Sequence, residues 1–217
     1  MSKKQNSFKD TLKEYMSKRL SLAPYQQVGI ILLTIVFAGF FGWVYEFIFY
    51  YFDSGMTQFY MQGGNLLPWM NIYAIGAILI LALVQVLKIK HRPWLVFLAA
   101  AVASGVLELV AGWLVYTIGN GIRYWDYNVE ILNFGNIGGF VCLRSALAFG
   151  LSALFLTYII MPFFIMLARK MSRRAFLTLA ISLFSIVMLD EIANLTLKNL
   201  NMPTAMDFYR SLGLKYK

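Results

Sequence analysis

The stretch WLVFLAAAVASGVLELVAGWLVYTIG, residues 94–119, decides the fold class. It is long enough to cross a bilayer, whose hydrocarbon core takes about 20 apolar residues in a helix. One ionisable side chain, Glu108, lies near its middle. Insertion scales put the cost of an ionised carboxylate at that depth at roughly 2.5–3.5 kcal/mol. A membrane protein therefore keeps such a group for a partner, a water-filled cavity or a task.

The whole chain has the composition of a membrane protein. Its 217 residues are 60% hydrophobic and 13% charged, whereas soluble domains carry about 25% charged residues. Five apolar runs have the length and character of a span, at residues 28–50, 70–88, 94–118, 145–167 and 175–196. We therefore predict an all-α fold, a polytopic transmembrane helix bundle of about five spans.

The basic residues predict the orientation of this bundle. Of the 19 Lys and Arg, six fall within the first 20 residues, three within residues 88–92 and four within residues 169–174. Each group flanks an apolar run, which is the positive-inside distribution. The pattern predicts a cytoplasmic N-terminus and, after five crossings, an external C-terminus. Because the net charge of +9 is accounted for in this way, we expect no binding of nucleic acid.

The segment before the first span predicts an amphipathic helix. Apolar side chains recur at helical spacing among lysines, at Phe8, Leu12, Tyr15, Met16 and Leu20. Ser7 with Asp10 predicts a helix cap. Such a helix lies on an anionic leaflet, so membrane lipids are an expected partner. We divide the chain into an N-terminal amphipathic segment (1–25), a transmembrane domain (26–197) and a C-terminal tail (198–217).

Several kinds of site are disfavoured by what the sequence lacks. The single Cys142 excludes an internal disulfide, and the single His91 excludes a multi-histidine metal site. We expect neither a metal nor a cofactor. No phosphate-binding G-x-x-x-x-G-K-[ST] loop is present, so any use of ATP requires a separate ATPase subunit.

The ionisable residues of the spans gather in the outer half of the predicted bundle. Glu46 lies near the outer end of the first span, and Arg144 opens the fourth. Asp190 and Glu191 lie near the outer end of the fifth, where they are more typical of a span end than of a site.

Glu108 is expected to face protein rather than lipid. It shares one helical face with three small residues, Ala101, Gly105 and Gly112, and such residues let neighbouring helices approach closely. Arg144 is its expected partner, because a guanidinium stays charged when buried and can hold a carboxylate with two bonds. One alternative is that Arg144 snorkels to the interface. For Glu108 the alternative is a structural role, either in an ion pair or as a protonated carboxyl group hydrogen-bonded within the bundle.

Five ordered motifs carry a family resemblance: FGWVYE (41–46), LLPWMNIYAIGA (66–77), ELVAGW (108–113), RYWDY (123–127) and NIGGFVCLRSALAFG (136–150). Over roughly residues 38–165 the chain resembles the type IV ABC-transporter permease family, the CmpB-like bacterial membrane proteins. The resemblance implies a bacterial cytoplasmic membrane, ABC-type transport with a separate ATPase subunit, and a common site at Glu46, Glu108, Trp125, Asp126, Cys142 and Arg144.

The leading hypothesis is a membrane protein that binds or transports a polar or amphiphilic solute through an outward-facing pocket. The predicted binding residues are Glu46, Tyr73, Glu108, Trp125, Asp126, Tyr127, Cys142 and Arg144. One alternative is an intramembrane enzyme acting on lipid, with Glu108 or Asp126 as general acid or base. The residues show no nucleophile–base arrangement that favours it. The other alternative is an accessory or scaffold subunit of a membrane complex.

Overall fold

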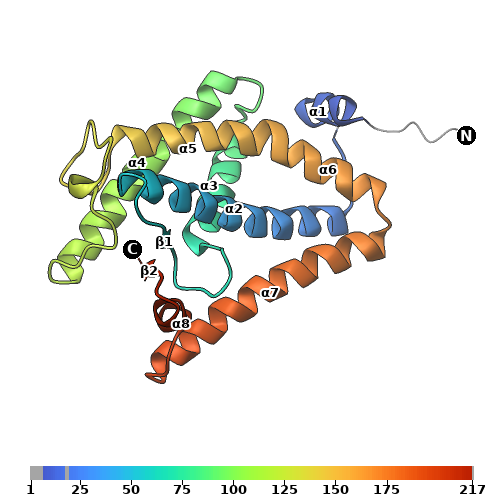
Figure 1. The fold of residues 1–217 in the computed structure, drawn as a ribbon. Coiled ribbons are helices and arrows are strands. Elements are labelled where there is room, and N and C mark those ends of the chain that lie inside the picture. Colours follow the sequence, from blue (N-terminus) through green and yellow to red (C-terminus); the bar gives the residue numbers. More distant parts are fainter. Residues whose placement is uncertain (1–6, 18–19, 217) are drawn as a thin grey trace, which may run out of the picture. The chain divides into compact units, whose positions relative to one another are not determined.

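The computed structural model describes residues 7–17 and 20–216, and its fold is all-α, as predicted. The helices are α1 (Phe8–Met16), α2 (Pro24–Asp53), α3 (Asn71–Val86), α4 (Pro93–Ile118), α5 (Leu143–Phe155), α6 (Met161–Lys170), α7 (Arg173–Asn199) and α8 (Ala205–Ser211) (Figure 1). There are also two short strands, β1 (Tyr60–Met61) and β2 (Lys215–Tyr216), and a 3-10 helix, Tyr127–Val129. Four residues of the predicted N-terminal basic cluster lie outside the described residues: Lys3, Lys4, Lys18 and Arg19.

Each of the five predicted spans holds an apolar helix. Four stretches are long and apolar enough to cross a membrane: Pro24–Asp53, Pro93–Ile118, Leu143–Lys170 and Arg173–Asn199. The third of these joins α5 to α6 through a π-helical turn, Leu156–Ile160. Helix α3 has 16 residues and is about 24 Å long at 1.5 Å per residue. Because a hydrocarbon core is about 30 Å thick, flanking residues must complete a crossing by α3.

The chain divides into two compact units. Unit 1 combines Met1–Ile78 with Ile160–Lys217, and unit 2 is Leu79–Ile159. In unit 1, α2 packs against α6 and α7. A Cβ atom on Gly29 would lie 2.3 Å from the ring of Phe176, and one on Gly39 would lie 2.1 Å from the indole of Trp69. These positions therefore require glycine, because a larger side chain would push the packed aromatic rings away.

The two ends of α2 show how α7 runs within unit 1. At the start of α2, Gln26 donates a hydrogen bond to the carbonyl of Ala168 near the end of α6 (3.0 Å). Beyond the far end of α2, strand β1 pairs in parallel with the C-terminal strand β2. Helix α7 starts just after α6, near the start of α2, and the chain reaches β2 near the far end of α2. Helix α7 therefore runs along α2 from one end of the unit to the other.

Helix α1 docks on the end of α6. Ser7 caps α1 by accepting a hydrogen bond from the backbone N–H of Asp10, as predicted. Arg169 of α6 donates two hydrogen bonds of 2.7 Å to the carboxylate of Glu14. This contact holds the pKa of Glu14 below its ordinary value. Lys13 on α1 stays exposed, so a basic side chain remains available to an anionic surface.

Unit 2 is built on the packing of α4 against α5. Its buried core consists of Ile80, Val84, Val96, Ala100 and Ala153. Gly150 on α5 allows the close approach, since a Cβ there would lie 2.8 Å from the ring of Phe97 on α4. The segment between these two helices folds back onto them and forms the candidate site.

Candidate functional site

The segment between α4 and α5, residues 119–142, packs its aromatic side chains onto α4. The indole N–H of Trp125 donates to the carbonyl of Phe140 (2.8 Å). A Cβ on Gly112 would lie 3.0 Å from Phe140 and 3.1 Å from Trp125. The small residue that was expected to admit a neighbouring helix therefore admits two aromatic residues of the following segment.

Asp126 forms hydrogen bonds with other residues of this segment. Its Oδ1 accepts hydrogen bonds from the backbone N–H of Asn128 (3.0 Å) and from the Asn128 side-chain amide (2.7 Å). Gly139 has a positive φ of 79°, and a Cβ there would lie 2.4 Å from the Asp126 carboxylate. The described hydrogen bonds of Asp126 therefore hold the loop in shape.

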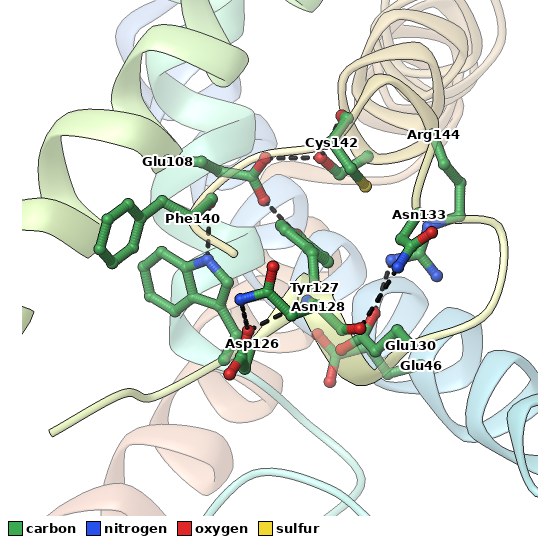
Figure 2. Close-up of polar contacts among 12 residues, drawn as sticks. Glu46, Glu108, Asp126, Tyr127, Asn128, Glu130, Asn133, Phe140, Cys142 and Arg144 are labelled. Atoms are coloured by element: carbon green, nitrogen blue, oxygen red, sulfur yellow. Dashed lines mark hydrogen bonds and ion pairs between the residues drawn. The ribbon is translucent and has the colours of Figure 1, made fainter. Parts of the chain in front are cut away.

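Glu108 lies where α4, the segment and α5 meet. Its Oε1 accepts a hydrogen bond from the Tyr127 hydroxyl (2.6 Å) (Figure 2). Its Oε2 lies 2.7 Å from the Ser145 hydroxyl. Burial raises the pKa of the Tyr127 phenol, and the neighbouring Glu108 raises it further. Tyr127 therefore remains a hydrogen-bond donor. We call Glu108, Tyr127 and Ser145 the Glu108 cluster.

The ion pair of Arg144 differs from the predicted one. Its Nη2 lies 2.6 Å from Oε2 of Glu130, with side-chain exposures of 12% and 4% (Figure 2). The guanidinium also lies over the ring of Tyr127, 5.3 Å from its centroid. The ion pair of Arg144 is therefore with Glu130 rather than with Glu108 as predicted. Glu130 belongs to the segment between α4 and α5, and the prediction considered only residues of the spans.

Two residues of the site, Glu130 and Ser145, were not predicted from the sequence. Glu130 stands between Val129 and Ile131, and an acid among apolar residues in a loop is a usable signal of burial. Ser145 directly follows Arg144, and nothing in its type or spacing distinguishes it from other serines in membrane helices.

Cys142 contributes its backbone rather than its thiol to the described contacts. It is the N-cap residue of α5, and its side chain is buried. Its carbonyl oxygen lies 2.8 Å from the Ser145 hydroxyl and accepts the backbone N–H of Ala146 (3.2 Å). The residue thus positions Ser145 at the start of the helix.

Glu46 and Tyr73, two further predicted residues, belong to unit 1. The Tyr73 hydroxyl on α3 donates to Oε1 of Glu46 on α2 (2.7 Å). The two helices approach closely here, since a Cβ on Gly42 would lie 2.0 Å from the Tyr73 ring. Each unit therefore holds a glutamate of an apolar helix that accepts a tyrosine hydroxyl.

Asp190 and Glu191 on α7 fasten the loop that leads into α3. Asp190 accepts the backbone N–H groups of Leu66 (3.2 Å) and Leu67 (2.8 Å). Glu191 accepts the side-chain amides of Asn65 (2.7 Å) and Asn71 (2.9 Å). These acids therefore do more than end a span, because they set the path of the loop. We call Asp190 and Glu191 the α7 acid pair.

The cavities and metal-binding capacity of the described residues are limited. Unit 2 has an open recess lined by apolar atoms of Leu109, Val110, Trp113, Ile137, Gly138 and Phe140. Within residues 7–17 and 20–216, no group of three or more His, Cys, Asp or Glu side chains is placed to hold a metal ion. This recess therefore offers an apolar surface, and the polar groups of the candidate site lie in the Glu108 cluster, the Glu130–Arg144 pair and the Asp126 contacts.

Comparison with known proteins identifies the family. The family described as "Putative ABC-transporter type IV" (ABC_trans_CmpB) matches residues 33–195. No curated protein matches the chain, and no solved structure does. The matched region contains both tyrosine-bound glutamates and extends past the motifs at residues 38–165 on which the resemblance rests. The chain belongs to this family of ABC-transporter-related membrane proteins.

Proposed function

We propose that this chain is the permease subunit of an ABC-type transporter in a bacterial cytoplasmic membrane. In this proposal a polar or amphiphilic solute binds at the Glu108 cluster. One observation carries it: Glu108 lies well inside the apolar helix Pro93–Ile118, and both of its carboxylate oxygens face hydroxyl groups. Intramembrane carboxylates commonly mark substrate or ion pathways. Family membership supports the link to transport.

The chemistry of the cluster favours a solute that donates hydrogen bonds. A hydroxyl, amide or ammonium group of the solute can replace Tyr127 or Ser145 as donor to Glu108. Trp125 and Tyr127 offer aromatic faces, on which a cationic group can stack. Cys142 and Arg144 frame the same region of unit 2, whereas Glu46 and Tyr73 offer a second carboxylate–hydroxyl pair in unit 1.

A separate ATPase subunit supplies the energy in this proposal, because the sequence contains no phosphate-binding loop. The end of unit 1 that carries α1 is proposed to face the cytoplasm, in keeping with the basic residues Lys170, Arg173 and Arg174 nearby. A reporter that fluoresces only in the cytoplasm tests this arrangement. It should be bright when fused to the N-terminus and dark when fused after β2, and the reverse would refute the orientation.

The binding proposal is tested by identifying the molecules that co-purify with the protein. Mass spectrometry of the purified wild-type chain should detect a bound solute or lipid. In Glu108→Gln the amount of this species bound per protein should be at least tenfold lower. Glu14→Gln is the matched control, since it makes the same substitution on α1 outside the spans. If Glu108→Gln retains the wild-type amount while remaining folded, the site assignment fails.

A scaffold role is the second candidate, and one observation favours it. Both oxygens of Glu108 already accept or share hydrogen bonds with protein groups, so the cluster joins α4, the following segment and α5 without any ligand. In that case Glu108→Gln should lower the thermal stability of the protein while leaving any bound species unchanged. Measuring both quantities on the same samples separates the two functions.

A further inference from the structure

The Ser145 hydroxyl has two acceptors and one proton. Its Oγ lies 2.7 Å from Oε2 of Glu108 and 2.8 Å from the carbonyl oxygen of Cys142. A serine hydroxyl donates a single hydrogen and can accept with its two lone pairs. With its proton directed to Cys142, the hydroxyl turns a lone pair toward Glu108.

Two complete hydrogen-bond arrangements follow from this geometry. When Glu108 is ionised, Ser145 donates to Oε2. When Glu108 carries a proton on Oε2, the carboxyl group donates to Ser145 Oγ, and Ser145 donates to the Cys142 carbonyl. Both states use the same atoms at the same distances, and the Ser145 hydroxyl only has to rotate between them. A buried polar group therefore gains a partner in either protonation state.

The surrounding contacts are compatible with both states. Tyr127 donates to Oε1 whether or not Oε2 carries a proton. The Cys142 carbonyl keeps the backbone N–H of Ala146 as a partner when Ser145 turns away. Arg144 is paired with Glu130, so the nearest cation already has a carboxylate. Among the described residues, the charges of Arg144 and Glu130 act on Glu108, and the Cys142 thiol acts on Tyr127.

We propose that Glu108 and Ser145 form a proton-binding site, in which Glu108 takes up and releases one proton while the Ser145 hydroxyl reverses its direction. On release, the O–H bond at Oε2 breaks and the proton passes to a water molecule, leaving a carboxylate that accepts from Ser145. On uptake, hydronium returns the proton and the relay reverses. The inference uses the site of the proposed function but requires no bound solute.

Infrared difference spectroscopy of the purified protein tests this proposal. The probe is the proton itself, varied from about pH 6 to about pH 9, above the ordinary pKa of Asp and Glu and below that of Tyr. The wild-type protein should show the carbonyl stretching band of a protonated carboxylic acid, and this band should disappear as the pH rises. Glu108→Gln should abolish the band. Glu46→Gln, which changes the tyrosine-bound glutamate of unit 1, should leave it in place.

Variants of Ser145 test whether its hydroxyl takes part in proton binding or whether Glu108 is a buried acid that titrates without it. Ser145→Ala should move the band to the frequency of a more weakly hydrogen-bonded carboxyl group, and Ser145→Thr should restore it because threonine also carries a hydroxyl. The proposal is overturned if no pH-dependent band responds to Glu108→Gln, or if Ser145→Ala leaves the band unchanged. Either result leaves the solute measurement untouched, so the two proposals fail separately.

Discussion

The Glu108 cluster and the α7 acid pair place carboxylates in apolar helices with opposite kinds of partner. Asp190 accepts two backbone N–H groups, which can only donate. Glu108 faces two hydroxyls, and the one on Ser145 has a second acceptor within 2.8 Å. Backbone donors hold a carboxylate in one arrangement, whereas hydroxyls can reverse. The first set of contacts therefore fixes a loop, and the second can accommodate a change of charge or ligand.

Position along the helix does not separate these two carboxylates. Glu108 is 15 residues from the start of α4 and 10 from its end, or about 22 Å and 15 Å at 1.5 Å per residue. Asp190 is nine residues from the end of α7 and accepts from a loop at that end. An ionised group costs most near the bilayer centre. The two carboxylates therefore differ in their partners rather than in their distance from a helix end, and only the hydroxyl partners of Glu108 also suit a neutral carboxyl group.

The largest predicted effect comes from breaking the Glu130–Arg144 pair, which stands beside the Glu108 cluster. Arg144→Met should lower the free energy of unfolding by about 3 kcal/mol, because it leaves a buried carboxylate without its cation. The double variant with Glu130→Gln should recover part of this loss. Chemical denaturation in detergent measures both. Equal stability of the wild-type protein and Arg144→Met would contradict a structural ion pair.

A smaller loss is expected for the α7 acid pair. Asp190→Ala removes the acceptor of two backbone N–H groups and should lower the free energy of unfolding by about 2 kcal/mol. Hydrogen exchange at Leu66 and Leu67 should speed up in this variant, while the carboxyl band of Glu108 stays unchanged. Asp190→Asn keeps one acceptor oxygen and serves as the control. A change in the Glu108 band would show that the two regions are not independent.

The spans were predictable from the sequence because hydropathy and length act locally. Every predicted run holds a helix, and the basic cluster at 169–174 lies at the turn between α6 and α7. The π-helical turn at Leu156–Ile160 was not predictable, because its residues are as apolar as their neighbours. Hydropathy measures the cost of burial and carries no information about a single extra residue in a helical turn.

The site was predictable by residue type but not by pairing. An acid deep in an apolar run identified Glu108 as a residue with partners, and Tyr127 was among the predicted binding residues. The predicted direct pair of Arg144 with Glu108 is not the one found, because that prediction assumed that only span residues reach the site; Arg144 pairs with Glu130. Glu130 reaches Arg144 through the fold of residues 119–142, which depends on glycine geometry and on hydrogen bonds within the loop. Such tertiary contacts leave no periodic signal.

Removing the tyrosine hydroxyl beside either Glu108 or Glu46 should lower the unfolding free energy by less than the preceding variants do. Tyr127→Phe and Tyr73→Phe each remove one hydroxyl donor to a carboxylate, and each should cost about 1 kcal/mol of unfolding free energy. Only Tyr127→Phe should shift the Glu108 carboxyl band, since Tyr73 donates to Glu46. Thermal unfolding and infrared spectra of the two variants provide the measurements. Identical spectra for both would refute the contact between Tyr127 and Glu108.

The smallest effect concerns a carboxylate outside the spans, Glu14, whose contacts lack the reversibility of the Glu108 cluster. Arg169 lowers the pKa of Glu14 in the folded protein, so this contact stabilises the docked α1 above the unfolded pKa of about 4.3. The stabilisation is lost as the pH falls through the lower folded value. Because Glu14 is 40% exposed, the contribution is about 0.5 kcal/mol. Hydrogen exchange of α1 should therefore speed up modestly in acid, and Glu14→Gln should remove that pH dependence. If α1 exchanges equally fast in both proteins at every pH, Arg169 does not hold it.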